Sequence, residues 1–317
     1  MKLITAEDIA AAANTLDGRV RRTPVVELAA AGFGNNIAGK FEHWQRTGTF
    51  KARGALLSID ALDKSQREAG VTAVSAGNHA IATAFAAREA GVSAHVVMTA
   101  SANPLRVQRC RDLGAFVEIA GSVHAAFDRV AAIQRDAGRA FIHPFDSREM
   151  LLGSATLGAE IVAQCPDVER VIVPIGGGGL AGGLAAAIKL LRPECQVIGV
   201  EPDGAASMQL SLRCGEAKTI DEVKTIADSL GAPYARPYSF AHCARFLDRV
   251  DTVSDSELRR AMQRLHDSLG FAVEPACAAS TAWLERYGNS ADGRRTVLLF
   301  CGSNIDVGSV ASLLVDV

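Results

Sequence analysis

One lysine in this sequence follows a polar turn and precedes a run of helix-forming residues, which is a setting for amine chemistry. Thr47-Gly48-Thr49 supplies hydroxyl and backbone N–H groups, and Phe50 and Lys51 follow at the expected start of a helix. The positive end of a helix destabilises an ammonium ion, so it lowers the pKa of the amine and favours the neutral, nucleophilic form. Lysines of this kind form Schiff bases. We expect ordinary surface positions for the lysines at Lys40, Lys64, Lys189, Lys218 and Lys224.

A run of glycines after an expected strand is the densest motif of the chain. The apolar stretch 171–175 leads into Gly176, Gly177, Gly178 and Gly179, and Leu180 opens a helical run. Backbone N–H groups in such a turn, together with the positive end of the helix, close around an anion, so the motif predicts a phosphate site. The glycines at 177, 179 and 182 also match the dinucleotide pattern G-x-G-x-x-G, and Glu201 lies about twenty residues further on. A nicotinamide-dependent oxidoreductase is therefore an alternative interpretation.

A second turn between an expected strand and an expected helix carries small and polar residues. It reads Ser75-Ala76-Gly77-Asn78-His79. The Ser75 hydroxyl, the Asn78 amide and the backbone N–H groups can hold a carboxylate. The same two side chains can instead cap the helix, and a histidine in this position can be a simple packing residue.

The elements that must position these turns alternate along the chain. We expect strands at 72–75, 94–98, 116–119, 168–173, 196–200 and 296–300, and helices at 79–90, 123–137, 155–164, 180–192 and 256–269. Strands that alternate with helices predict an α/β protein with parallel sheets covered on both faces. The strands fall into two groups, so we predict a large domain of residues 1–46 and 143–317 and a small domain of residues 47–142 inserted into it. The region 203–245 lacks periodicity and is expected to be an irregular flap.

The composition excludes several other classes of protein. The 317 residues are 49% hydrophobic and carry a formal charge of −2, so disorder and binding to a nucleic acid are not favoured. No apolar run approaches the length of about twenty residues that a membrane span needs, and the N-terminus lacks a signal-peptide core. The seven cysteines form no C-x-x-C pair. We expect a cytoplasmic protein.

Four motifs, in order, resemble those of one family. Residues 47–54, Ser75 to His79, Gly176 to Leu180 and Cys301-Gly302-Ser303-Asn304 look like the motifs of fold-type II pyridoxal-phosphate enzymes, in the threonine/serine dehydratase and serine racemase branch. The resemblance spans nearly the whole chain. It implies a fold like that of the tryptophan synthase β-subunit, with two mainly parallel sheets flanked by helices, and pyridoxal 5'-phosphate as cofactor.

The resemblance also implies roles for individual residues. By similarity, Lys51 joins the cofactor covalently and later takes the Cα proton, and Phe50 lies against the cofactor ring. Gly176, Gly177, Gly178, Gly179 and Leu180 would bind the phosphate through backbone N–H groups. Asn78 would bond to the phenolic oxygen of the cofactor, and Ser75, Ala76, Asn78 and His79 would border the substrate carboxylate.

Three further positions refine these implications. Ala76 stands where the racemases of this branch carry a serine that acts on the second face of Cα, so dehydration is favoured over racemisation. Cys301 occupies the position beside the pyridine nitrogen, where a thiol is only a weak, neutral donor. Glu201 and the carbonyl of Ala205 match a divalent-cation segment in some relatives, but Ser207 replaces an acidic ligand there, which weakens the site.

We therefore predict β-elimination from a small hydroxy amino acid, with L-threonine or L-serine as the leading substrate, to give a 2-oxo acid and ammonia. Alternatives are a dehydratase for 3-hydroxyaspartate or a hydroxyectoine-derived amino acid, a serine racemase-like activity, the oxidoreductase already named, and a silent protein that stores the cofactor. A second anionic group on the substrate would need an extra cation in the pocket, and the sequence points to none. The branch is usually dimeric, so a homodimer is expected.

Overall fold

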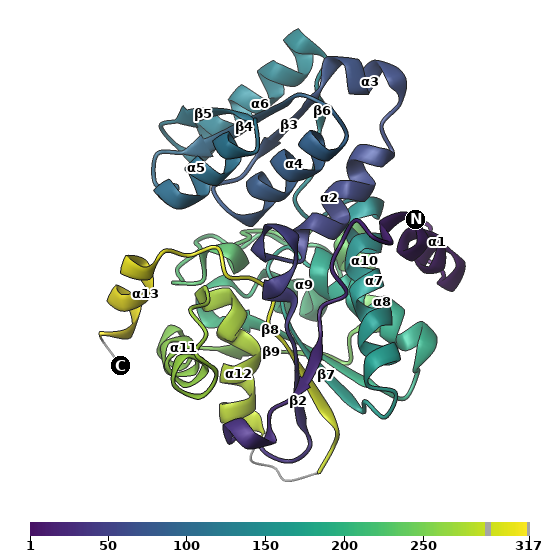
Figure 1. Cartoon of the computed structure of the whole chain (residues 1–317), viewed down its shortest axis with the longest axis vertical. Helices are drawn as coiled ribbons and strands as arrows, with labels where there is room; N and C mark the ends of the chain where they lie inside the picture. The colour runs from purple at the N-terminus through teal and green to yellow at the C-terminus, as the bar shows by residue number, and fades with distance from the viewer. Residues whose placement is uncertain (289–292, 316–317) are drawn as a thin grey trace.

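The structure, a computed structural model, describes residues 1–288 and 293–315 and contains two separate sheets joined by helices (Figure 1). The six-stranded sheet has the order β1-β2-β10-β7-β8-β9 and the four-stranded sheet has the order β5-β4-β3-β6. The strands are β1 Val25–Glu27, β2 Ile37–Lys40, β3 Val71–Val74, β4 Ala94–Thr99, β5 Phe116–Ala120, β6 Ala140–Phe141, β7 Arg170–Pro174, β8 Gln196–Pro202, β9 Arg249–Val253 and β10 Thr296–Leu299.

The helices connect the strands and cover both sheets. They are α1 Ala6–Leu16, α2 Lys51–Asp60, α3 Lys64–Ala69, α4 Asn78–Glu89, α5 Pro104–Asp112, α6 Val123–Ala137, α7 Arg148–Gln164, α8 Gly179–Leu191, α9 Ser207–Cys214, α10 Pro237–Phe246, α11 Asp255–Leu269, α12 Pro275–Tyr287 and α13 Val307–Leu314. No helix among the described residues combines the length and apolar character needed to cross a bilayer.

The large sheet is parallel except at one edge. Strands β2, β10, β7, β8 and β9 run in the same direction, whereas β1 pairs with β2 in the antiparallel sense. Every residue of β10 is buried, and so are all residues of β7 after Arg170, because α8 and α12 cover the sheet. The carboxyl ends of these strands meet at one edge, which faces the small sheet (Figure 1).

The four strands of the small sheet are all parallel, and side chains on its two faces join different cores. On one face, Val97 contacts Ala126, Val130 and Ile133 of α6 in a separate small cluster. On the other face, Val96 belongs to the main core together with residues of α4. The side chains alternate in this way because successive residues of a strand point to opposite faces.

Helix α2 lies between the two sheets and crosses α7 at short range (Figure 1). A Cβ atom on Gly54 would lie 2.8 Å from the Cα atom of Met150, and one on Gly153 would lie 2.3 Å from the backbone nitrogen of Gly54. The two glycines therefore allow a close backbone crossing that a larger residue would block. This crossing fixes the helix whose first residue is Lys51.

The predicted α/β class with two mainly parallel, helix-flanked sheets is confirmed, and each of the six predicted strands overlaps an observed one. Helix α6 has the predicted bounds, whereas α7 begins at Arg148, earlier than predicted. The expectation of an irregular region at 203–245 was wrong in part, because α9 and α10 lie within it. The division into domains at residues 46/47 and 142/143 stays a prediction.

Candidate active site

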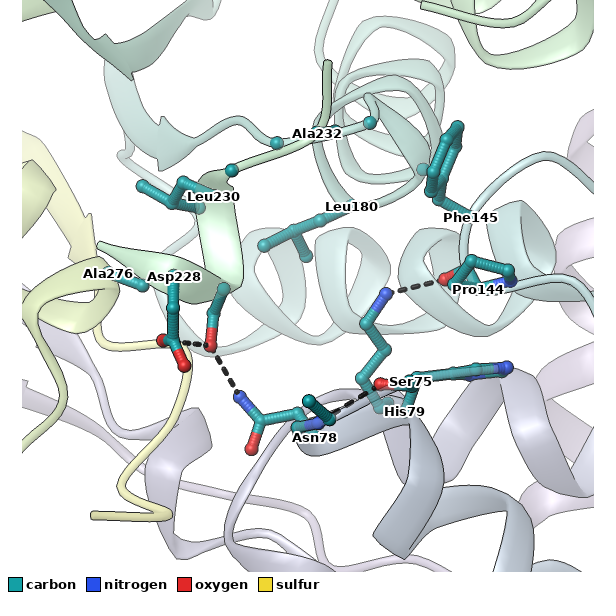
Figure 2. A pocket seen from close by; sticks show the side chains of 18 of the residues that line it. Ser75, Asn78, His79, Pro144, Phe145, Leu180, Asp228, Leu230, Ala232 and Ala276 are labelled. Atoms are coloured by element: carbon teal, nitrogen blue, oxygen red, sulfur yellow. Dashed lines mark hydrogen bonds between the residues drawn. The ribbon is translucent and has the colours of Figure 1, made fainter. Parts of the chain in front are cut away.

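A cavity of about 350 Å³ lies where the carboxyl ends of both sheets face each other (Figure 2). The loop after β7 supplies Gly176 to Leu180 and the loop after β3 supplies Ser75 to His79, so the two predicted turns line the same cavity. Phe50, Lys51 and Cys301 also line it. All of these predicted site residues therefore come together, although they are far apart in the sequence. The size is within the range of small-molecule sites in proteins, about 300–1,000 Å³.

Lys51 is the first residue of α2, and its side chain extends across the cavity. The Nζ atom donates a hydrogen bond to the Pro144 carbonyl oxygen at 2.5 Å and lies 5.1 Å from the centre of the Phe50 ring. Desolvation in the cavity lowers the pKa of the amine to about 8. The sequence predicted a lowered pKa from the helix N-terminus, whereas burial is the larger cause in the structure.

A buried ion-pair network holds α2 two residues after Lys51. Arg53 pairs with Glu42 at 2.6 Å and with Glu160 at 2.7 Å, and Lys40 pairs with Glu160 at 2.7 Å. Lys40 is fully buried, so the prediction that it is an ordinary surface lysine was wrong. The strand that carries Lys40, β2, was not predicted, so the burial of this lysine could not be predicted either. Removing one member of such a network leaves an unpaired charge in the interior.

The glycine loop is shaped so closely by its neighbours that side chains would not fit. Gly178 caps α8 with φ of 88°, in the left-handed region. A Cβ atom on Gly177 would lie 2.4 Å from the Phe145 ring, and one on Gly179 would lie 2.5 Å from the Phe145 carbonyl oxygen. The first N–H groups of a helix have no partner within the helix, so this bare backbone at the start of α8 can hold a phosphate. The residues present therefore fit the phosphate of the cofactor that the sequence resemblance implies.

The loop after β3 presents polar groups that are already positioned. The Ser75 hydroxyl accepts a hydrogen bond from the Gly77 N–H at 3.1 Å, and His79 Nε2 lies 2.8 Å from the Ile142 carbonyl oxygen. Desolvation lowers the pKa of His79 to about 3, so its ring is neutral at pH 7. Asn78 does not cap α4, because Gly77 is the N-cap residue and makes no side-chain capping bond. The alternative that Ser75 and Asn78 serve only as caps is therefore not supported.

A polar network that the sequence did not predict connects the two walls of the cavity. Arg106 of α5 donates to the Asn304 carbonyl oxygen at 2.8 Å, to Asp228 at 2.5 Å and to Glu274 at 3.2 Å. Asn78 donates to Glu274 at 2.8 Å and accepts from the Asn304 amide at 2.6 Å. Desolvation raises the pKa of Glu274, and Arg106 opposes this effect. Asn78 and Asn304 stood in recognised motifs, whereas Arg106, Asp228 and Glu274 did not, and no spacing in the sequence pairs Arg106 with its partners.

Cys301 is buried and lies in the loop after β10, where it lines the cavity. The neighbouring Cys277 and desolvation raise the pKa of the Cys301 thiol well above its ordinary value. The group is therefore a neutral thiol at physiological pH. This agrees with the weak donor that the sequence predicted at this position, whereas contact with a cofactor ring stays a prediction.

Glu201 is buried and bonded to the start of α9. Its carboxyl oxygens accept hydrogen bonds from the Met208 and Gln209 N–H groups, both at 2.8 Å, at the start of α9. Burial raises the pKa of Glu201 to about 8. Within residues 1–288 and 293–315 no group of three His, Cys, Asp or Glu side chains is suited to a metal ion. Glu201 is the one carboxylate among Glu201, Ala205 and Ser207, and both its oxygens are bonded to backbone N–H groups, so a divalent-cation site here stays a prediction.

The remaining wall of the cavity is largely apolar. It comprises Val74, Val123, Phe127, Pro144, Phe145, Pro174, Leu230, Ala232, Pro233, Tyr234 and Ala276. Val123 and Phe127 belong to α6 of the small sheet, and Leu230 to Tyr234 belong to the segment before α10. The sequence singled out none of these side chains.

Comparison with known proteins places this geometry in a family. A family model described as "Pyridoxal-phosphate dependent enzyme" matches residues 16–302. The chain is 48% identical to phenylserine dehydratase of Ralstonia pickettii, over 92% of this chain and 90% of that protein. It is 35% identical to L-threonine ammonia-lyase of Thermotoga maritima, over 98% of this chain and 78% of that protein.

A solved structure gives the same result. The structure of maize serine racemase superposes with a TM-score of 0.91 and 30% sequence identity, covering 99% of this chain and 98% of the maize chain. These similarities overturn the nicotinamide alternative for the glycine loop. The chain belongs to the pyridoxal-phosphate dependent enzymes, in the branch that contains the threonine dehydratases and serine racemases.

Proposed function

We propose that the protein is an ammonia-lyase that dehydrates a 3-hydroxy amino acid with an aromatic ring on Cβ, of the phenylserine type, to a 2-oxo acid and ammonia. The reaction class is that of the family, and the ring is the finer part of the proposal. The 48% identity to phenylserine dehydratase supports it. Threonine and serine, the leading substrates predicted from the sequence, become the second candidate, supported by the 35% identity to a threonine ammonia-lyase.

The observation that carries the proposal is the apolar wall beside the loop Ser75 to His79. If that loop holds the substrate carboxylate, the substrate side chain extends toward aromatic and aliphatic groups such as Phe127, Leu230 and Tyr234. A phenyl ring gains free energy from such a wall in proportion to the apolar area it buries, and a methyl group gains much less.

The charges in the cavity argue against a substrate with a second carboxylate. Among the described residues that line it, the cationic side chains are Lys51 and Arg106. Arg106 already pairs with Asp228 and Glu274, and Lys51 is needed for the reaction. A second anionic group would therefore face apolar residues or the exposed carboxylate of Asp228. This weakens the alternatives of 3-hydroxyaspartate and a hydroxyectoine-derived substrate.

Each lining residue then has a defined task. Gly176 to Leu180 would hold the cofactor phosphate through backbone N–H groups, and Phe50 and Cys301 would border its ring. Bound pyridoxal phosphate supplies a conjugated system that accepts the electrons released when Cα loses its proton. Lys51 takes that proton, since an amine with a pKa of about 8 is partly neutral at physiological pH. Ser75, Asn78 and the loop N–H groups orient the substrate carboxylate.

The residue at position 76 supports elimination over racemisation. Ala76 lines the cavity. If it borders the face of Cα opposite Lys51, as the resemblance implies, its methyl group offers no proton there. One base suffices for elimination, whereas inversion of Cα needs an acid on the second face. We therefore expect ammonia release without racemisation of the remaining substrate, and the substitution Ala76→Ser to introduce racemisation.

A panel of substrates tests the proposal. Purified protein is incubated with the stereoisomers of phenylserine, threonine, serine and 3-hydroxyaspartate, and ammonia and 2-oxo acid are measured. We expect the highest kcat/KM for a phenylserine isomer. A higher kcat/KM for threonine or serine would favour the second candidate, and visible absorbance without turnover of any substrate would favour a cofactor-storage protein. A homodimer and a cytoplasmic location stay predictions.

A further inference from the structure

We propose that Val123 and Phe127 of α6, together with Tyr234, which lines the same cavity, form the subsite that receives the aromatic ring and sets substrate selection. This inference rests on the proposed function and deepens it, because it assigns the selection to particular side chains of the small-sheet wall. None of these residues belongs to the four sequence motifs.

Helix α6 presents two different apolar faces. Ala126, Val130 and Ile133 are buried against the small sheet, as expected for an amphipathic helix. Val123 and Phe127 lie on the adjoining face, one helical turn apart, and are 62% and 41% exposed. Both line the cavity. They therefore belong to neither hydrophobic core and lie beside the space where the substrate side chain is expected.

The opposite wall is held in place by its own contacts. The Tyr234 ring lies 6.0 Å from the Phe145 ring, and the guanidinium of Arg236 lies 4.7 Å from the Tyr234 ring centre. Tyr234 also forms an isolated bridge with Thr219. Phe145 in turn packs against Gly177 of the phosphate loop. The position of Tyr234 is thus tied to the cofactor end of the cavity.

An aromatic ring fits between these walls for a physical reason. Aromatic groups prefer offset or edge-to-face contacts, and Phe127 and Tyr234 bring rings to the cavity from two different segments of the chain. A phenyl group on Cβ would cover the apolar surface of Val123 and Phe127, whereas a methyl or hydrogen would leave most of it in water. The subsite therefore discriminates by the apolar area that only the larger substrate buries.

The variant Phe127→Ala tests this assignment, and Phe116→Ala is a matched control. Phe116 is a 63% exposed phenylalanine on the neighbouring strand β5 that does not line the cavity. For Phe127→Ala we expect kcat/KM for phenylserine to fall by about 10- to 100-fold, mainly through KM, while kcat/KM for threonine changes by less than about threefold. Phe127→Leu should retain an intermediate activity, and Phe116→Ala should match the unmodified enzyme. Retained visible absorbance of the bound cofactor verifies folding.

Inhibition by phenylalanine separates this inference from the proposed function. Phenylalanine carries the ring but no hydroxyl group to eliminate, so its inhibition constant reports the subsite whichever substrate is turned over. We expect this constant to rise about tenfold or more in Phe127→Ala. Equal losses for both substrates, or an unchanged inhibition constant, would overturn the subsite. If the unmodified enzyme prefers threonine but phenylalanine binding still depends on Phe127, the proposed substrate fails and the subsite stands.

Discussion

The two walls of the cavity are built by different means. In the wall from the large sheet, the glycine loop is bare backbone: Gly177 and Gly179 crowd against Phe145, so an added methyl group on either would collide. The wall from the small sheet consists of side chains, and two of them, Val123 and Phe127, are half exposed on α6. A backbone cradle admits one phosphate-bearing cofactor, whereas side chains can change without disturbing the fold. The first wall therefore suits the cofactor of the family, and the second is where we propose that the substrate is selected.

Removal of the Lys51 amine should have the largest effect on activity, because this side chain extends across the cavity between the two walls. In Lys51→Ala we expect loss of the visible absorbance of the bound cofactor and a fall in kcat of about 10⁴-fold or more, because one side chain holds the cofactor and moves the Cα proton. The control is Lys64→Ala, an exposed lysine of α3. Absorbance and 2-oxo acid formation that both survive Lys51→Ala would refute the assignment.

The network that joins the walls should matter most for stability. Arg106→Leu would leave Glu274 buried without its cation, so we expect the free energy of unfolding to drop by about 3 kcal/mol. Urea denaturation of the cofactor-bound protein measures this. The double variant Arg106→Leu with Glu274→Gln should recover part of the loss, because no buried carboxylate is then unpaired. A double variant that loses the sum of both single effects would contradict the coupling.

A methyl group added to the glycine loop should weaken binding of the cofactor phosphate and leave the wall from the small sheet unchanged. In Gly179→Ala the new Cβ would lie 2.5 Å from the Phe145 carbonyl oxygen, so the backbone must shift. Strain of about 1–3 kcal/mol corresponds to a rise of about 10- to 100-fold in the Kd of pyridoxal phosphate, measured by titration of the stripped protein. Gly121→Ala, where the added Cβ meets nothing within 4 Å, is the control. Equal affinity in both variants would argue that the cofactor phosphate binds elsewhere.

The smallest effect concerns the protonation of Lys51. Burial lowers its pKa to about 8, so the neutral amine that attacks the cofactor aldehyde becomes more abundant as the pH rises. The rate at which stripped protein takes up pyridoxal phosphate should rise about tenfold between about pH 7 and pH 9 and then level off. An inflection near the ordinary lysine pKa of about 10.4 would show that the amine is exposed to water in the stripped protein.

The same contrast explains what the sequence could predict of the fold. Strands β3, β4, β7, β8 and β10 are rich in apolar and β-branched residues, as expected for a parallel sheet covered on both faces. The short strands β1, β2 and β6 and the outer strand β9 have a weaker apolar pattern and were missed. Lys40 was wrongly taken as exposed because its burial depends on Glu160, which lies 120 positions away.

The residues of the site also fall into two groups, those that the sequence predicted and those that it did not. The glycine loop and Lys51 were predictable, since each forms a contiguous motif whose backbone or neighbours carry the chemistry. Arg106, Asp228 and Glu274 meet only through the fold, and no local pattern pairs them. Val123 and Phe127 look like ordinary residues of an amphipathic helix, so their position beside the cavity emerges only when α6 is placed on the small sheet.

A crystal structure of the cofactor-bound enzyme with phenylalanine, in both enantiomers, tests the division between the two walls most directly. We expect density that joins Lys51 or the amino acid to the cofactor, the phosphate on the N–H groups of Gly176 to Leu180, and the phenyl ring between Phe127 and Tyr234. A phosphate outside the glycine loop, or a ring that points away from α6 into solvent, would contradict this expectation.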